Sequence, residues 1–195
     1  MKIVIGLTGT TGSGKTTVSQ EFERSGFYVI NCDKVAKYVV ENNEQVLSQL
    51  CSRFGNDIIS DGSLDRQLLA SRAFSDKKST DTLNTITLPP IVNEILNKIN
   101  TSENDYVLLD APTLFESGAD KLCSATVGVI SNDETRKKRI IQRDKITAEQ
   151  AQQRIDAQKS NDFFKKNCTY IIENNSTIDT LIKQTQTIIN TILKG

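Results

Sequence analysis

The sequence contains no histidine, the side chain that most often serves as a general base near neutral pH. Any acid–base chemistry is therefore expected from a carboxylate. The cysteines are few and widely scattered, at Cys32, Cys51, Cys123 and Cys168, and they form no CxxC pair. Without histidine or paired cysteines, the sequence predicts neither a zinc site nor a disulfide framework.

An excess of charge is also missing, because 24 Lys and Arg residues balance 24 Asp and Glu residues. Non-specific binding to nucleic acid requires a basic excess that displaces counterions from phosphates, so no nucleic-acid partner is expected. No apolar run approaches the roughly 20 residues that span a bilayer. The apolar segment that begins the chain is too short for a signal peptide. These absences predict a cytoplasmic protein with no membrane partner.

The chain has 195 residues, of which 37% are hydrophobic, and this is enough for a single domain, 1–195, with a substantial core. Continuous apolar runs lie at 3–7, 27–30, 106–109, 125–130 and 170–172. Such runs are typical of strands buried on both faces of a parallel sheet. Helical spacing of apolar residues follows the first run, from about 15 to 24, and returns over 178–193.

The long segment between the second and third runs contains no convincing strand. Its apolar residues have helical spacing, first in Val46, Leu47, Leu50 and Phe54 and then in Leu64, Leu68, Leu69 and Phe74. Asp61-Gly62 predicts a turn between these two groups, and Pro89-Pro90 predicts the boundary of a further helix over 91–99. The segment from about 34 to 100 is therefore expected to be a helical insertion in an α/β core.

The strongest motif is GTTGSGKT at 9–16, a complete match to GxxxxGK(S/T) that directly follows an apolar run and opens an amphipathic helix. Its glycines allow backbone N–H groups to converge on a phosphate, and the helix presents the positive end of its dipole to the same anion. Lys15 is expected to pair with the β and γ phosphates of ATP, and the Thr16 hydroxyl to ligate Mg²⁺. The residues predicted to bind ATP are Thr11, Gly12, Ser13, Gly14, Lys15, Thr16 and Thr17. The alternative, a chance glycine turn, does not account for this context, and we expect a P-loop NTPase fold: three layers, α/β, with a parallel sheet.

Two carboxylates stand at the ends of apolar runs, and ligands of an open α/β sheet bind outside the carboxyl ends of its strands. Asp33 follows the second run, where it is a candidate to accept the proton of a substrate hydroxyl or to hold a water on Mg²⁺. The alternative is that Asp33 caps a helix that begins near Lys34. Asp110 ends the third run and is a candidate for the outer shell of Mg²⁺, with a strand-end turn as its alternative.

The segment 136–143, RKKRIIQR, carries five basic residues in eight. Arg139 and Arg143 are four residues apart and would share one face of a helix, so they are candidates to clamp phosphoryl oxygens during transfer. The alternative is a solvated basic helix face. The polar residues that follow show little core-like periodicity and predict a mobile lid over about 144–160, which would keep water away from ATP.

Five segments together carry a family resemblance: IGLTGTTGSGKTTVS at 5–19, FYVINCD at 27–33, DGSLDR at 61–66, DAPTLFE at 110–116, and the pattern RxxQRD…T…R…Q formed by Arg139, Gln142, Arg143, Asp144, Thr147, Arg154 and Gln158. In these segments the chain resembles the dephospho-coenzyme A kinase family nearly end to end. The resemblance implies that Asp33 is the base facing the ribose 3′-hydroxyl, and that Lys15, Arg139 and Arg143 are catalytic with it. The residues that it implies for substrate binding are Asp33, Asp65, Arg66, Pro112 and Leu114, and those for the metal are Thr16 and Asp110.

The activity that the resemblance implies is the last step of coenzyme A biosynthesis, phosphorylation of dephospho-coenzyme A by ATP and Mg²⁺ in a monomer or small homo-oligomer. Two positions depart from the family pattern: Pro89 stands where the family usually has histidine, and Thr113 where it has leucine. One alternative is a P-loop kinase for another small acceptor, such as a nucleoside, a nucleotide or a sugar acid. Another is a nucleotide-dependent switch or nucleic-acid-handling ATPase. The lack of an NKxD motif weighs against a GTPase switch.

Overall fold

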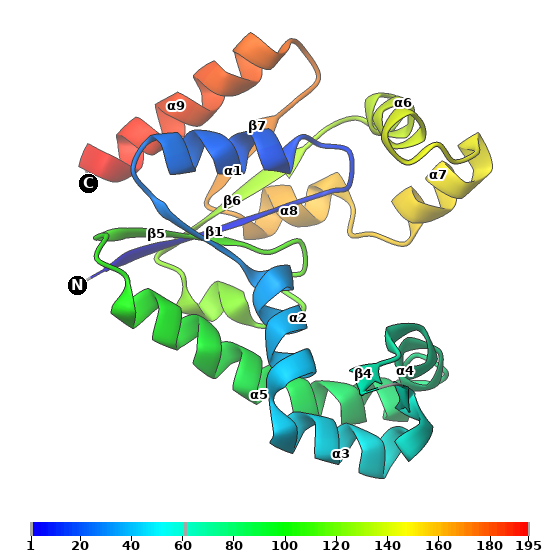
Figure 1. Cartoon of the computed structure of the whole chain (residues 1–195). Helices are drawn as coiled ribbons and strands as arrows, with labels where there is room; N and C mark the ends of the chain where they lie inside the picture. Colours follow the sequence, from blue (N-terminus) through cyan, green and yellow to red (C-terminus); the bar gives the residue numbers. More distant parts are fainter. Residues whose placement is uncertain (1, 61, 195) are drawn as a thin grey trace. The chain divides into compact units, whose positions relative to one another are not determined.

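The computed structural model describes residues 2–60 and 62–194 (Figure 1). Its backbone contacts divide the chain into two compact units. The core unit consists of the residues up to 30 together with those from 102 onward, and the inserted unit consists of residues 31–101.

The core unit is built on a five-stranded sheet in the order β2-β5-β1-β6-β7. Its strands are β1 (Ile3–Gly9), β2 (Tyr28–Asn31), β5 (Tyr106–Asp110), β6 (Ala125–Ile130) and β7 (Tyr170–Glu173). The pairs β1 with β5, β1 with β6 and β6 with β7 are parallel. The predicted α/β fold with a parallel sheet is confirmed, and each predicted strand lies within two residues of its observed bounds at either end.

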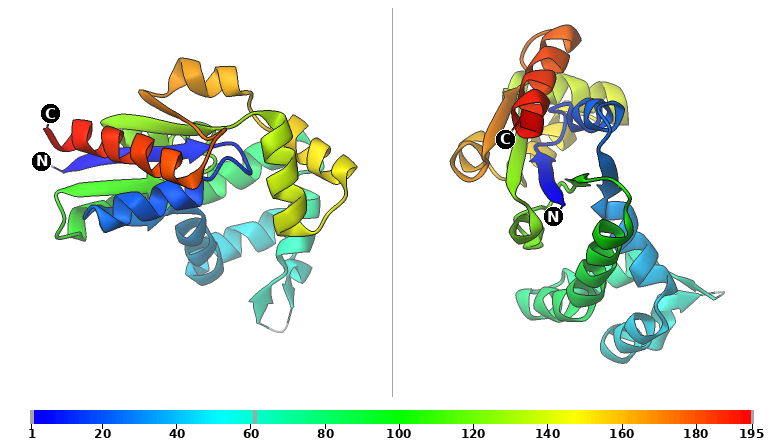
Figure 2. Two further views of the ribbon diagram at one scale, coloured as in Figure 1. Left: turned by 90° about the horizontal axis from the view of Figure 1, so that it is seen from above. Right: turned by 90° about the vertical axis from the view of Figure 1, so that its left-hand side faces the viewer.

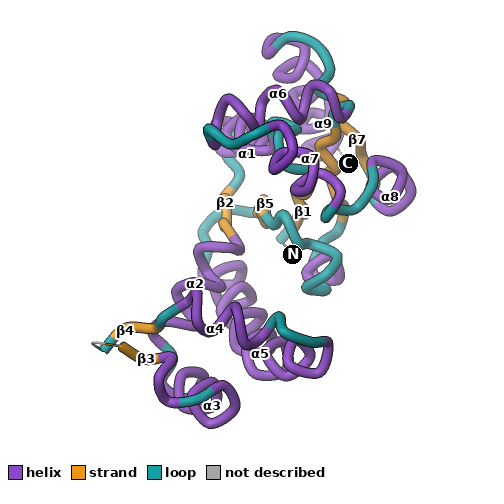
Figure 3. The backbone as a smooth tube through the Cα atoms, turned by 90° about the vertical axis from the view of Figure 1, so that its right-hand side faces the viewer, coloured by secondary structure: helices purple, strands orange, loops and turns teal. Residues whose placement is uncertain are grey.

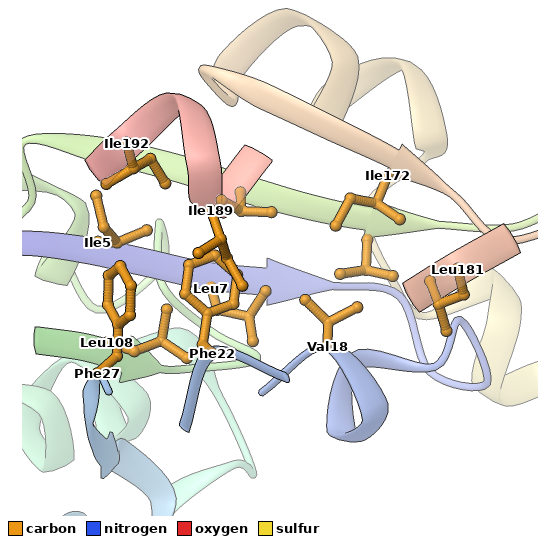
Figure 4. Close-up of a cluster of buried hydrophobic side chains, with 12 residues drawn as sticks. Ile5, Leu7, Val18, Phe22, Phe27, Leu108, Ile172, Leu181, Ile189 and Ile192 are labelled. Carbon is orange, nitrogen blue, oxygen red and sulfur yellow. The ribbon is translucent and has the colours of Figure 1, made fainter. Parts of the chain in front are cut away.

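Helices α1 (Lys15–Arg24) and α9 (Ile178–Lys194) lie side by side on one face of this sheet (Figure 2). The alternation of side chains along β1 decides which residues meet them, because successive residues of a strand point to opposite faces. Ile5 and Leu7 join the buried cluster under α1 and α9, whereas a side chain at Gly6 would meet Leu114 and Cys123 on the other face. Figure 4 shows the cluster, in which Phe22 and Val18 of α1 and Ile189 and Leu181 of α9 contact the strands.

The second face of the sheet is covered by α8 (Asn161–Asn167) and by the segment that contains the short helix η2 (Ala119–Leu122). Cys168, which ends α8, lies so close to β6 that a Cβ on Gly128 would come within 2.8 Å of its sulfur. Burial raises the pKa of the Cys168 thiol from its ordinary value of 9.0 to about 11.

We therefore expect Cys168 to be alkylated slowly by iodoacetamide in the folded protein, because only the thiolate is a nucleophile. At pH 8 the raised pKa alone lowers the thiolate fraction by about 100-fold. Peptide mapping by mass spectrometry should show that the alkylation rate of Cys168 rises between pH 9 and 11. Once the chain is denatured, Cys168 should react as fast as ordinary thiols. Complete alkylation at pH 8 without unfolding would contradict the burial.

Helices α6 (Asp133–Asp144) and α7 (Ala148–Asp156) form a pair in the core unit, and both follow β6 in the chain. The expectation of little core-like periodicity in the polar stretch that begins at 144 is wrong in part. Ile140 of α6 is fully buried against Ala151 and Ile155 of α7, so the pair has a small apolar core of its own. Two core positions in a nine-residue helix are too few to stand out as a pattern in the sequence.

The inserted unit is mainly helical. It contains α2 (Cys32–Asn42), α3 (Glu44–Phe54), η1 (Asn56–Ile58), α4 (Arg66–Ala73) and α5 (Lys77–Thr101). A small antiparallel hairpin, β3 (Ile59–Ser60) with β4 (Ser63–Leu64), was not predicted from the sequence (Figure 3). Strands of two residues are too short to show period-two alternation in the sequence. Leu64, which was predicted to belong to a helix with Leu68 and Leu69, instead belongs to this hairpin. Of the predicted Asp61-Gly62 turn, Asp61 lies outside the described residues.

Helix α5 contradicts the predicted boundary at Pro89-Pro90, because it continues through both prolines. The helix survives there because it packs against α2, α3 and α4, and because residues on both sides of the prolines, Thr87 before them and Ile95 and Ile99 after them, are buried. Proline lacks the N–H that would bond to the carbonyl four residues earlier, so tertiary packing offsets this local loss. Among the described residues, neither this helix nor any other is long and apolar enough to cross a bilayer.

The substitution Pro89→Ala restores a helical hydrogen bond and removes a ring clash, which should gain about 3 kcal/mol. The more flexible unfolded chain should cost about 1 kcal/mol of this. We therefore expect a net stabilisation of about 2 kcal/mol. Urea unfolding measures the change. Asn84→Ala, at an exposed position of the same helix, is the matched control and should gain only about 0.5 kcal/mol from helix propensity. Equal gains for the two variants would mean that α5 breaks at the prolines in solution.

Candidate active site

The phosphate loop connects the end of β1 to the start of α1. Gly9 lies against the backbone carbonyl of Val129 on β6, where a Cβ could not fit. Gly14 forms the N-terminal cap of α1 with φ of 96°, a left-handed conformation that a side chain would strain. The two glycines therefore let the chain leave the sheet and enter α1 within five residues, which leaves backbone N–H groups at the N-terminus of the helix.

A cavity of about 670 Å³ opens beside this loop in the core unit. Of the residues predicted to bind ATP, all but Ser13 line it. Ser13 is completely buried, so its side chain has no surface to offer the cavity. The rest of the lining comes from Gly9, Thr10, Pro112, Arg139, Gln142, Arg143, Gln158, Asn174, Ile178 and Leu181. The structure thus brings the loop together with both predicted arginines at one cavity.

Lys15, which begins α1, forms an ion pair with Asp110, which ends β5. The two residues meet because β1, which leads into the phosphate loop, and β5 are adjacent parallel strands. Asp110 is only 6% exposed, and Lys15 is half-buried. The hydroxyl-bearing Thr16 is exposed on the first turn of α1. The Lys15 ammonium, the buried Asp110 carboxylate and the exposed residue Thr16 therefore all lie at or beside the start of α1.

Arginines of α6 contact the phosphate loop. Arg143 forms a two-pronged ion pair with Asp144, and its Nη2 lies 3.5 Å from Thr11 Oγ1. Asp144 raises the pKa of the Arg143 guanidinium, and Arg143 in turn lowers the pKa of Asp144. Arg154 of α7 also pairs with Asp144. Asp144 therefore joins the end of α6 to α7.

Arg136, which the sequence did not single out, is the most buried of these arginines, at 2% exposed. Its guanidinium donates to the Thr11 carbonyl at 3.1 Å, to Asp133 at 3.0 Å and to Gln158 Oε1 at 2.9 Å. Burial lowers the pKa of this guanidinium, and Asp133 opposes that change. Gln158 Oε1 also accepts a 2.8 Å bond from the Thr11 N–H, so one side-chain oxygen joins the segment that follows α7 to the loop.

Asn174 was also missed from the sequence. It follows β7, is buried, and donates from Nδ2 to the Ser13 carbonyl at 2.8 Å. Its side-chain and backbone oxygens accept bonds from Arg139 at 3.3 and 3.2 Å. The only sequence signal for Asn174 was its place just after a buried strand, which is the edge of the sheet where ligands bind.

Two of the predicted substrate-binding residues belong to the core unit. Pro112 lines the cavity, and its carbonyl accepts a 3.1 Å bond from the Thr8 hydroxyl. Leu114 is completely buried next to Gly6, so in this structure it has no surface to offer a ligand.

The other predicted substrate-binding residues, Asp33, Asp65 and Arg66, belong to the inserted unit. The alternative that Asp33 caps a helix is wrong, because the cap of α2 is Asn31, whose side chain accepts from the Lys34 N–H. Asp33 lies exposed in the first turn of that helix. Asp65 caps α4, and Arg66 forms a 3.0 Å ion pair with Glu41 of α2.

Comparisons with known proteins agree over nearly the whole chain. A family model described as dephospho-CoA kinase matches residues 3–180. A curated dephospho-CoA kinase from Fusobacterium nucleatum is 38% identical over 191 residues, which cover 97% of this chain and 98% of that protein. A solved structure of a Thermus thermophilus protein is 28% identical with a TM-score of 0.87, covering 100% of this chain and 99% of the other. The dephospho-CoA kinase from Campylobacter jejuni is 26% identical with a TM-score of 0.66, at the same coverage.

Proposed function

This chain belongs to the dephospho-CoA kinase family, and we propose that it transfers the γ-phosphoryl group of ATP to the 3′-hydroxyl of dephospho-coenzyme A, giving coenzyme A and ADP. One observation carries the proposal. In a chain of this family, the phosphate loop with Lys15 and two arginines of α6, Arg139 and Arg143, line one cavity large enough for a nucleotide.

The loop residues 11–17 hold the phosphates of ATP through backbone N–H groups, and Lys15 neutralises charge on the β and γ phosphates. Lys15 is paired with Asp110 in this structure, so nucleotide binding exchanges a carboxylate partner for a phosphate partner. Because the transition state for phosphoryl transfer is loose, positioning and charge neutralisation contribute more than basicity.

Mg²⁺ fits the donor chemistry of this site. Thr16 offers an exposed hydroxyl and Asp110 a carboxylate, which are the hard oxygen donors that Mg²⁺ prefers. No cluster of three acidic, cysteine or histidine side chains that could hold a metal occurs within the described ranges, and this is compatible with an ion held by one or two protein oxygens, water and phosphates. When bound, the ion supplies positive charge to the phosphates.

Asp33 acts on the acceptor. Its carboxylate accepts or orients the proton of the 3′-hydroxyl, as expected in a chain without histidine. Asp65, Arg66 and Pro112 contribute to binding of the coenzyme, and Leu114 supports the strand ends through packing.

Arg139 and Arg143 stabilise the charge that develops on the transferred group, and the segment 144–160 closes over the cavity to exclude water. We further propose that the protein is cytoplasmic, acts as a monomer or small homo-oligomer, and has a small-molecule substrate rather than a nucleic-acid partner.

The test is ADP release from ATP and Mg²⁺ with and without dephospho-coenzyme A, with the product identified by mass. We expect ADP to form only with the acceptor, and the acceptor to gain one phosphoryl group. Coenzyme A is the matched control ligand, since its 3′-hydroxyl is already phosphorylated, and it should support no turnover. Turnover with a nucleoside, nucleotide or sugar acid in place of dephospho-coenzyme A would favour a P-loop kinase for another acceptor.

A further inference from the structure

Three consecutive carbonyls of the phosphate loop accept hydrogen bonds from side chains far away in the sequence. The bonds run from Arg136 Nε to Thr11 O at 3.1 Å, from Arg139 Nη1 to Gly12 O at 3.3 Å, and from Asn174 Nδ2 to Ser13 O at 2.8 Å. Two of these donors are arginines of α6, and the third is the neutral amide that follows β7. The loop is therefore held by its carbonyls.

A carbonyl held on one side of a peptide plane fixes the direction of the next N–H, because the two groups of a planar trans peptide point in opposite directions. The bond to the Ser13 carbonyl thus turns the Gly14 N–H away from Asn174. Gly14 lines the cavity, and its N–H belongs to the first N–H groups of α1, which have no partner within the helix. The Asn174 amide therefore sets the direction of a loop N–H at the place where a phosphate binds.

Asn174 is suited to this role by its burial and by its own fixed backbone. Its N–H donates to the Ile130 carbonyl at 2.8 Å, and its carbonyl accepts from the Ser131 hydroxyl at 2.8 Å. A Cβ on Gly14 would come within 2.5 Å of Asn174 Nδ2, so the amide lies directly against the loop. The same side chain holds the Arg139 guanidinium through Oδ1 at 3.3 Å.

We propose that Asn174 is a positioning residue for the nucleotide: its amide donates to the Ser13 carbonyl and accepts from Arg139, so that the Gly14 N–H and the arginine are both oriented for the phosphates of ATP. This inference rests on the proposed use of the cavity for ATP. It assigns Asn174 no contact with the reacting atoms.

The test measures the Kd of ADP by titration calorimetry for the wild-type protein, Asn174→Leu and Asn174→Ala. Loss of a buried hydrogen-bond partner leaves the Ser13 carbonyl unpaired and the loop less ordered, so ADP should bind about 10- to 100-fold more weakly. The KM for ATP should rise with it, while the KM for dephospho-coenzyme A stays unchanged. Thermal unfolding of each variant reports the fold, and the alanine variant carries the test if leucine cannot be accommodated.

Gln184→Leu is the matched control. The Gln184 amide donates to the carbonyl of Glu173 and accepts from its N–H, both at 3.2 Å, so this variant also loses one donor and one acceptor beside the end of β7. Neither of these two bonds involves the phosphate loop. The ADP affinity of Gln184→Leu should therefore match that of the wild type. Wild-type ADP affinity in a folded Asn174 variant overturns the inference. Weakened ADP binding in a protein that does not phosphorylate dephospho-coenzyme A would overturn the proposed acceptor and leave the role of Asn174 standing.

Discussion

Replacement of Asp33 by asparagine is expected to lower kcat by about 100- to 1,000-fold and to leave the KM for ATP close to that of the wild type. Asparagine keeps the shape of the side chain but cannot accept the proton of the acceptor hydroxyl. The fold should survive, because Asn31 rather than Asp33 caps α2. Steady-state kinetics with dephospho-coenzyme A as the varied substrate measures the effect.

Glu44→Gln provides the control for this substitution. Glu44 lies exposed in the first turn of α3, which is capped by Asn43 in the same way as α2 is capped by Asn31. Both substitutions remove one negative charge near the start of a helix, and each costs a similar, small interaction with the helix dipole. If Asp33→Asn retained the turnover of Glu44→Gln, Asp33 would have no role as base or as orienting group.

Replacement of Lys15 by methionine is expected to lower kcat by about 1,000-fold, since one positive charge at the developing phosphates is removed while the backbone of the loop remains. The same change leaves the buried Asp110 carboxylate without its partner and should cost about 3 kcal/mol of stability. Turnover assays and urea unfolding separate these two effects.

The double variant Lys15→Met/Asp110→Asn tests whether lost activity is a consequence of lost stability. Removing both charges eliminates the unpaired carboxylate, so the stability should recover towards the wild-type value. The turnover should stay low, because the cation is still absent. Recovery of turnover together with stability would show that Lys15 acts only as the structural partner of Asp110.

The parts of the molecule that follow one local rule were predictable from the sequence. The central strands β1, β5 and β6 are buried on both faces, so each appears as a continuous apolar run, and the phosphate loop has a fixed spacing that its backbone geometry requires. The same reasoning failed where packing decides the outcome. Pro89 and Pro90 end a helix by local rules, but α5 continues because its residues before and after them are buried.

The residues missed at the cavity share a different property. Arg136 and Asn174 meet the loop across 125 and 161 positions of sequence, and neither forms part of a periodic pattern or a spaced motif. Arg136 stood within a basic run for which a solvated helix face was the alternative, yet its side chain is buried. Contacts of this kind depend on which strands are neighbours, and strand order cannot be derived from the composition of single segments.

The Thr11 N–H donates to Oε1 of Gln158, which follows α7, so this bond breaks when the segment after α7 leaves the loop. An amide proton exchanges with deuterium only when its hydrogen bond opens. If the segment 144–160 is the lid proposed above, the exchange rate of this single proton measures how often that lid separates from the loop, without substrate, turnover or an added probe.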